Sequence, residues 1–101
     1  MNNNSASQNL ETFKETSLTL KGSIGFDQEG RKILVNTKGK AFATNELILE
    51  IWRDLEKLSI KHTVCHGSLD KLVQQLKLPR EKVATVKSIL SKLASHGLIS
   101  F

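Results

Sequence analysis

Apolar and polar residues alternate over residues 18–26, and this period of two predicts a strand with one buried face. The residues expected to turn inward are Leu18, Leu20, Gly22, Ile24 and Phe26. The next four residues, Asp27-Gln28-Glu29-Gly30, are typical of a tight turn, because Gly30 adopts a positive φ without steric cost. A second strand is therefore expected directly after this turn.

Two shorter segments continue the strand pattern. Residues 32–36 predict a second strand with Ile33 and Val35 on one face, and residues 41–43 predict a third strand. The turn between them is Thr37-Lys38-Gly39-Lys40. The three segments together predict a small antiparallel meander.

Helical spacing of apolar residues replaces this pattern after residue 44 and predicts three helices. The inward stripes are Leu47, Ile48, Ile51, Trp52, Leu55 and Leu58 in the first, Leu69, Leu72, Val73 and Leu76 in the second, and Val83, Val86, Ile89, Leu90, Leu93 and Ala94 in the third. Trp52 lies within its stripe, so we expect it in the core rather than at a ligand site.

Capping residues mark the ends of these helices. Thr44 or Asn45 is suited to cap the first helix and Ser68 the second. Pro79 is expected in the first turn of the third helix, and Gly97 is expected to end it.

The second and third helices are separated only by the tight turn Lys77-Leu78-Pro79-Arg80, which is typical of a helix-turn-helix. Only a short strand, residues 98–101, is expected after the third helix, whereas a DNA-binding winged helix places most of its sheet there. We therefore predict an α+β, winged helix-turn-helix-like fold, with an N-terminal three-stranded antiparallel sheet followed by three helices. Residues 17–101 form this domain, and the polar residues 1–16 are expected to be a flexible tail.

The chain has 101 residues, enough for one domain, with 15 Lys and Arg against 10 Asp and Glu. This positive balance favours an anionic partner, which could be nucleic acid, an acidic peptide or an acidic protein surface. The single cysteine excludes an internal disulfide, and no segment is typical of a membrane span or a secretory signal. We expect a cytoplasmic protein without a membrane partner.

His62, Cys65 and His66 form the one cluster of possible zinc ligands in the sequence. A closed zinc site needs four ligands and a catalytic one usually three, and no second Cys or His pair completes the set. Cys65 also lacks a spaced acidic partner that would favour nucleophilic catalysis. We predict no metal, no cofactor and no enzymatic activity.

The third helix carries Arg80, Lys82, Lys87 and Lys92, which are suited to contact phosphates. Its expected outward residues are Ala84, Thr85, Ser88, Ser91 and Ser95. These side chains are poor at reading base edges, for which Arg, Asn and Gln are the usual residues. A small winged-helix DNA-binding regulator is therefore the alternative rather than the leading hypothesis.

Residues 18–101 resemble the PqqD-like family of precursor-peptide recognition elements. The similarity lies in GRKILVNTKGKAFATNELILEIW, which matches the family's second and third strands and first helix, and in SLDKLVQQL followed by EKVATVKSILSKLASHGLI. The family commonly has a short Asp-Gly link after the first helix, whereas this chain has the longer and more basic EKLSIKHTVCHG.

The resemblance implies a stand-alone, non-catalytic element that binds the leader segment of a ribosomally synthesised precursor peptide. In this family the element presents the peptide to a modifying enzyme, often a radical-SAM maturase, in the biosynthesis of peptide natural products (RiPPs). It also implies a groove between the third strand and the third helix, in which the leader adds as a further strand. Either a monomer or a homodimer is compatible with this role.

The residues themselves favour the same mode of binding, because a short strand at the end of a sheet is open to β-augmentation. The candidate leader-binding residues are Lys40, Ala41, Phe42, Ala43, Thr44, Lys82, Val86, Lys87, Ile89 and Leu90. Lys82 or Lys87 is expected to meet acidic leader residues, and which flank of the third helix faces the peptide stays open. We also expect proline at position 41 or 43 to block binding at one of the two positions far more than at the other.

Overall fold

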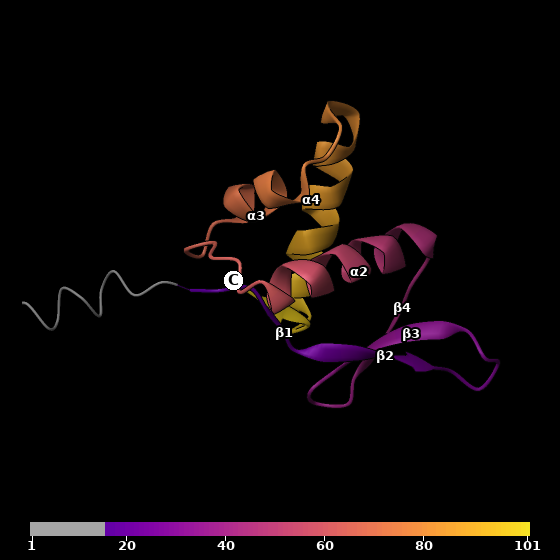
Figure 1. Ribbon diagram of the computed structural model, residues 1–101. Helices are drawn as coiled ribbons and strands as arrows, with labels where there is room; N and C mark the ends of the chain where they lie inside the picture. The colour runs from indigo at the N-terminus through magenta and orange to yellow at the C-terminus, as the bar shows by residue number, and fades with distance from the viewer. Residues whose placement is uncertain (1–15) are drawn as a thin grey trace, which may run out of the picture.

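The computed structural model describes residues 16–101, so residues 1–15 of the tail expected over residues 1–16 lie outside the described part of the chain. Over residues 16–101 the fold is α+β, with a small antiparallel sheet and three helices (Figure 1). The sheet has the order β2-β3-β4. Its strands are β2 (Gly22–Phe26), β3 (Lys32–Asn36) and β4 (Ala41–Ala43), and the helices are α2 (Glu46–Ile60), α3 (Leu69–Leu76) and α4 (Arg80–Ser95).

The strand predicted over residues 18–26 is broken at Lys21. Its first part, β1 (Thr19–Leu20), pairs with β5 (Ile99–Ser100), which follows the last helix, whereas β2 pairs with β3. Lys21 links the two ladders, because its N–H donates to the Leu98 carbonyl (2.7 Å) and its carbonyl accepts from the Thr37 N–H (3.2 Å). The chain therefore changes pairing partner at one residue, and the described strands do not all precede the helices.

The segment before β1 is bound to the loop between α2 and α3. Ser17 bridges Val64, and the Thr16 carbonyl accepts from the backbone N–H groups of Cys65 (3.0 Å) and His66 (3.4 Å). These two hydrogen bonds join Thr16, the last residue of the expected tail, to that loop.

The meander over residues 22–43 is confirmed, and Ile33 and Val35 share one face of β3 as expected. Leu34 is buried between its cross-strand neighbours Ile24 and Phe42, whereas Ile33 and Val35 lie on the opposite face. Residues 33–35 are all apolar, so alternation alone does not decide which face turns inward. Phe26, expected inward, is 65% exposed at the end of the β2–β3 hairpin.

The helix ends follow the capping residues. Asn45 caps α2 by accepting from the Ile48 N–H (2.9 Å), and Ser68 caps α3 by accepting from the Lys71 N–H (3.2 Å). At the end of α4, Gly97 has φ +72°, and the N–H groups of Gly97 and Leu98 donate to the carbonyls of Ala94 and Leu93. This pair of hydrogen bonds is a Schellman motif, which turns the chain into β5.

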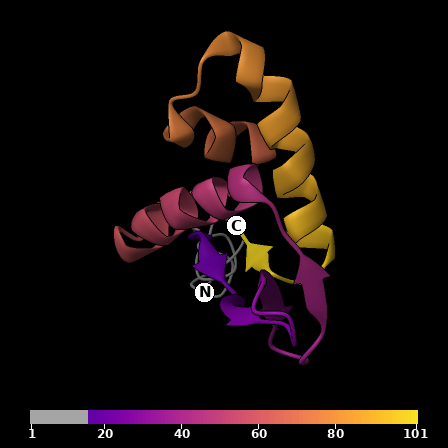
Figure 2. The ribbon, with the colours of Figure 1, turned by 90° about the vertical axis from the view of Figure 1, so that its right-hand side faces the viewer.

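One hydrophobic core joins the sheet, the helices and β5. Its residues are Leu18, Leu34, Ile51, Trp52, Leu55, Cys65, Leu72, Val73, Val86, Leu90, Leu93, Leu98 and Ile99. The predicted burial of Trp52 is confirmed. In Figures 1 and 2, α2 lies between the sheet and α3, and α4 runs from the α3 end of the molecule to the sheet end. Within residues 16–101, no helix combines the length and the apolar character that crossing a membrane requires.

Candidate functional site

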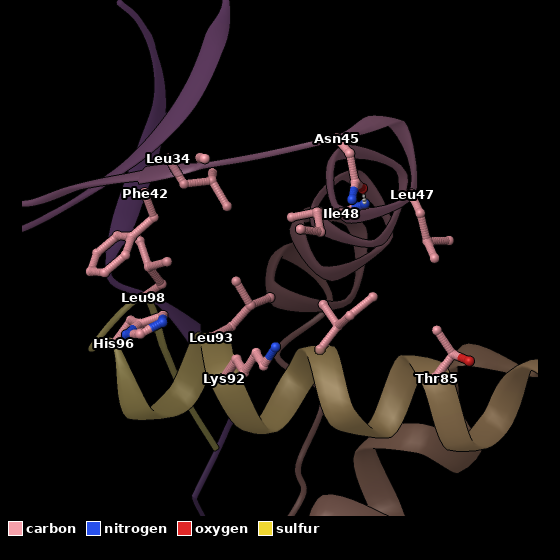
Figure 3. Close-up of a pocket in the computed structure, with 12 residues that line it drawn as sticks. Leu34, Phe42, Asn45, Leu47, Ile48, Thr85, Lys92, Leu93, His96 and Leu98 are labelled. Atoms are coloured by element: carbon pink, nitrogen blue, oxygen red, sulfur yellow. Dashed lines mark hydrogen bonds between the residues drawn. The ribbon is translucent and has the colours of Figure 1, made fainter.

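A groove of about 470 Å³ lies beside β4, bounded by α2 and α4 (Figure 3). Phe42 and Ala43 come from β4, Leu47 and Ile48 from the first turn of α2, and Thr85, Ile89, Lys92 and Leu93 from α4. Asn45, His96, Leu34 and Leu98 complete the lining. The surface is mostly apolar, and no acidic side chain of the described residues lines it.

The edge of the sheet along this groove is open. β4 pairs with β3 on one side, and no strand within residues 16–101 pairs with its other side. The Asn36 N–H donates to the Lys40 carbonyl (3.0 Å), and the register pairs Leu34 with Phe42. Because hydrogen-bonded pairs alternate in an antiparallel ladder, Phe42 bonds to β3, and the N–H and C=O groups of Ala41 and Ala43 point outward.

This register corrects one prediction. We expected proline at position 41 and at position 43 to differ strongly in effect, because donors alternate along a strand. Residues two positions apart have the same orientation, so Ala41 and Ala43 both present outward donors. The residue between them, Phe42, has the inward donor.

An aromatic stack closes one end of the groove. The rings of Phe42 and His96 are stacked, with centroids 4.2 Å apart and 22° between their planes. The Asn36 side-chain amide donates to the His96 carbonyl (2.9 Å), which fixes the end of α4 to the β3–β4 hairpin. The Lys40 ammonium lies 5.7 Å from the centroid of the Phe42 ring, within the range of a cation–π contact.

The structure separates the lysines of α4. Lys92 lines the groove, whereas Lys87 forms an ion pair with Asp70 of α3 (2.6 Å) on another side of the helix. Lys82 is exposed in the first turn of α4 and does not line the groove. Lys92, rather than Lys82 or Lys87, is therefore the lysine of α4 that lies in the groove.

The apolar candidates on α4 also divide. Ile89 lines the groove, whereas Val86 and Leu90 are buried in the core and leave no surface there for a ligand. Thr44 is held by the sheet, because its hydroxyl donates to the Lys32 carbonyl (2.7 Å). Of the ten candidates, Phe42, Ala43 and Ile89 line the groove, and Lys40 and Ala41 lie at its β4 end.

The other residues that line the groove are not among the ten predicted candidates. Ile89 lies four residues after Thr85, three before Lys92 and seven before His96. Helical spacing therefore places all of them on one face of α4. That spacing was a usable signal. No sequence pattern indicates that the first turn of α2, with Leu47 and Ile48, forms a third wall.

The His62, Cys65 and His66 cluster does not converge. The Cys65 side chain is 0% exposed, and burial raises the pKa of its thiol, while both histidines are exposed. His62 and His66 adopt positive φ angles of 55° and 50° in the loop. Within residues 16–101, no group of three His, Cys, Asp or Glu side chains is arranged to hold a metal ion.

Comparison of the chain with protein families, with curated proteins and with solved structures finds no match.

Proposed function

We propose that this chain is a non-catalytic recognition element of the PqqD-like type, with a winged-helix-like fold. In this proposal it binds the leader segment of a ribosomally synthesised precursor peptide as an added strand along β4. It presents the attached peptide to a modifying enzyme, which in the family it resembles is often a radical-SAM maturase.

The observation that carries the proposal is the open edge of β4 beside a mostly apolar groove. An added strand requires outward donors and acceptors, which Ala41 and Ala43 have, and small side chains that let another backbone approach. It also requires a place for alternate side chains of the ligand, because every second side chain of a strand points to the same face. The groove lies on the Phe42 side of the strand and meets this requirement.

Backbone pairing and groove contacts have different roles in the proposed binding. Ala41 and Ala43 offer at most four outward hydrogen bonds, each with a net contribution of about 0.5–1.5 kcal/mol. Ordering a disordered peptide opposes much of this gain. Affinity and selectivity therefore depend on apolar side chains of the peptide in the groove against Ile48, Ile89 and Leu93.

DNA binding has less support in the structure. The exposed residues of α4 include Ala84, Ser88, Ser91 and Ser95, which offer few contacts to base edges. Lys87 is engaged with Asp70, so it is not free to contact a phosphate without losing that pair. Specific binding of a DNA duplex at nanomolar affinity in physiological salt would contradict the proposal.

The test is an isothermal titration with a synthetic leader segment from a precursor peptide encoded beside the gene. Ala41→Pro and Ala43→Pro each remove one outward N–H, and we expect each to weaken binding about tenfold or more. The fold should survive, because neither donor takes part in the β3–β4 ladder and proline is tolerated at sheet edges.

Ala41→Ser and Ala43→Ser are the matched controls, because they change the same side chains and keep the N–H groups. Circular dichroism establishes that all four variants are folded. Equal affinity of the folded proline and serine variants would show that the leader does not bind along β4.

A further inference from the structure

We propose that the groove selects a peptide segment in which a large apolar residue is followed two residues later by Asp or Glu. Lys92 and His96, at the C-terminal end of α4, bind the acidic side chain, and Lys40 lies beside them. This inference rests on the proposed function and adds the chemistry of the ligand to it.

The groove has two chemically different ends. At one end Leu47, Ile48 and Ile89 present apolar side chains. At the other end, which we call the basic end, Lys40 and His96 lie against the Phe42 ring, and Lys92 lines the groove about one helical turn before His96. Figure 3 shows the chain from Phe42 to Asn45 along one wall and α4 along the other, with His96 facing Phe42 and Thr85 at the opposite end.

The two lysines of the basic end have no carboxylate partner within residues 16–101. The ion pairs in the described part of the chain join Arg31 to Asp27 and Glu29, and Lys87 to Asp70. Among residues 16–101, neither Lys40 nor Lys92 takes part in an ion pair, and no acidic side chain lines the groove. An acidic residue of the ligand would therefore supply the missing charge. Because Lys40, Lys92 and His96 are exposed, this attraction is modest and screened by salt, and it acts mainly on selectivity and on the association rate.

The spacing of the two ends matches the period of a strand. Side chains on one face of a ligand strand are about 6.6 Å apart. Along α4, each residue advances about 1.5 Å, so the midpoint between Lys92 and His96 lies about 7.5 Å from the level of Ile89. A ligand side chain that packs on Ile89 thus has its second neighbour level with Lys92 and His96.

The order of the two ligand residues follows from the direction of β4. Antiparallel pairing is somewhat more stable per residue than parallel pairing, and it is the commoner arrangement. An antiparallel ligand strand runs from the Asn45 end of the groove to the Phe42 end. Its apolar residue therefore comes first and its acidic residue second.

The test is selection from a displayed library of random eight-residue peptides, carried out with four forms of the full chain. These are the wild type, Lys92→Glu, the edge-blocked Ala43→Pro and the control Lys82→Glu. Lys82→Glu changes the net charge by the same amount as Lys92→Glu, but Lys82 is exposed on the same helix outside the groove.

We expect the wild type and Lys82→Glu to enrich an acidic residue two positions after a large apolar one. Lys92→Glu should enrich Lys or Arg at that position instead. A synthetic peptide from the wild-type selection should lose about two- to fivefold in affinity when its acidic residue becomes the amide, and this loss should shrink in Lys92→Glu.

Two other results overturn the inference, and they differ in what they say of the proposed function. In the first result, the selected peptides require the open edge but show no preference for an acidic residue, or they show the same preference with Lys92→Glu. This result excludes recognition of an acidic residue by Lys92 and leaves strand addition along β4 intact. Peptides that bind Ala43→Pro as well as the wild type, or no enrichment at all, exclude both.

Discussion

Two faces of α4 differ in how they are packed: one lies against α3, and the other lines the groove beside β4. The face toward α3 is closed, because Val86 and Leu90 are buried in the core and Lys87 is paired with Asp70. The face toward β4 is open, because Ile89, Lys92 and His96 line a groove. Buried apolar residues and a paired charge indicate a structural role, whereas partly exposed apolar residues beside cations indicate a surface suited to a ligand.

The comparison shows why a basic helix is a poor guide to a binding site. Lys82, Lys87 and Lys92 lie five residues apart in each step, so successive lysines point in directions about 140° apart around the helix. Their sequence contexts are similar, and only the neighbouring elements separate a paired lysine from one in a groove. The following variants test this division, from the largest expected effect to the smallest.

Replacing a core residue of α4 should destabilise the domain far more than replacing its groove neighbour. Leu90 is 0% exposed, so Leu90→Ala should lower the free energy of unfolding by about 2–5 kcal/mol. Ile89→Ala should cost less than half as much, because Ile89 is only partly buried, and it should weaken peptide binding. Urea denaturation measures both losses, and equal losses would show that the two faces are not distinct.

The closed end of the groove depends on Asn36. Its amide nitrogen donates to the His96 carbonyl, and its oxygen accepts from the N–H groups of Lys38 and Lys40 (3.0 Å each). Asn36→Ala should lower the free energy of unfolding by about 1–2 kcal/mol, because all three hydrogen bonds are lost. Asn36→Asp is the comparison variant, since it keeps the acceptor for the turn and replaces the donor to His96 with a carboxylate oxygen that faces the carbonyl. An Asp variant as stable as the wild type would mean that the bond to α4 contributes nothing.

The closed side of the molecule also contains Cys65, whose burial raises the pKa of the thiol above its ordinary value of 9.0, against a smaller lowering by Lys71. The unfolded chain then loses its proton at lower pH than the folded one. The buried, protonated thiol therefore makes its full contribution to stability below pH 9.0, and this contribution declines as the pH rises toward the folded-state pKa. The slope from one proton is at most about 1.4 kcal/mol per pH unit.

Denaturation at pH 8 to 10 should therefore show a steeper loss of stability for the wild type than for Cys65→Ala, which has no thiol to ionise. Parallel pH profiles of the two proteins would show that the thiol is accessible to solvent in the folded state.

The ion pair between α3 and α4 should have the smallest effect. Its side chains are 73% exposed for Asp70 and 45% for Lys87, so Asp70→Asn should cost about 0.2–1 kcal/mol, and less at high salt. Glu56→Gln is the control, because Glu56 is exposed on α2 and forms no ion pair within residues 16–101. Peptide affinity should not change in either variant, and a large loss in Asp70→Asn would place the ligand on the α3 side.

Much of the fold could be predicted because it is encoded locally. Asn45, Ser68 and Gly97 mark helix ends through hydrogen bonds and a backbone angle that depend on a few neighbouring residues. The open strand over residues 41–43 and Ile89 as a groove residue were also predicted from the sequence. Lys92 and His96 were missed, although their spacing from Ile89 places them on one helix face.

The sequence by itself determined the strands of the meander, the three helices and their caps, because alternation, helical periodicity and capping act over a few residues. Tertiary structure decided the change of partner at Lys21, the burial of Leu34 instead of Ile33 and Val35, and the pairing of Lys87 with Asp70. Each of these depends on a segment distant in sequence, such as β5 for the ladder that ends at Lys21. Residues 33–35 are apolar on both faces and the lysines of α4 have similar neighbours, so only the packing of the other elements distinguishes them.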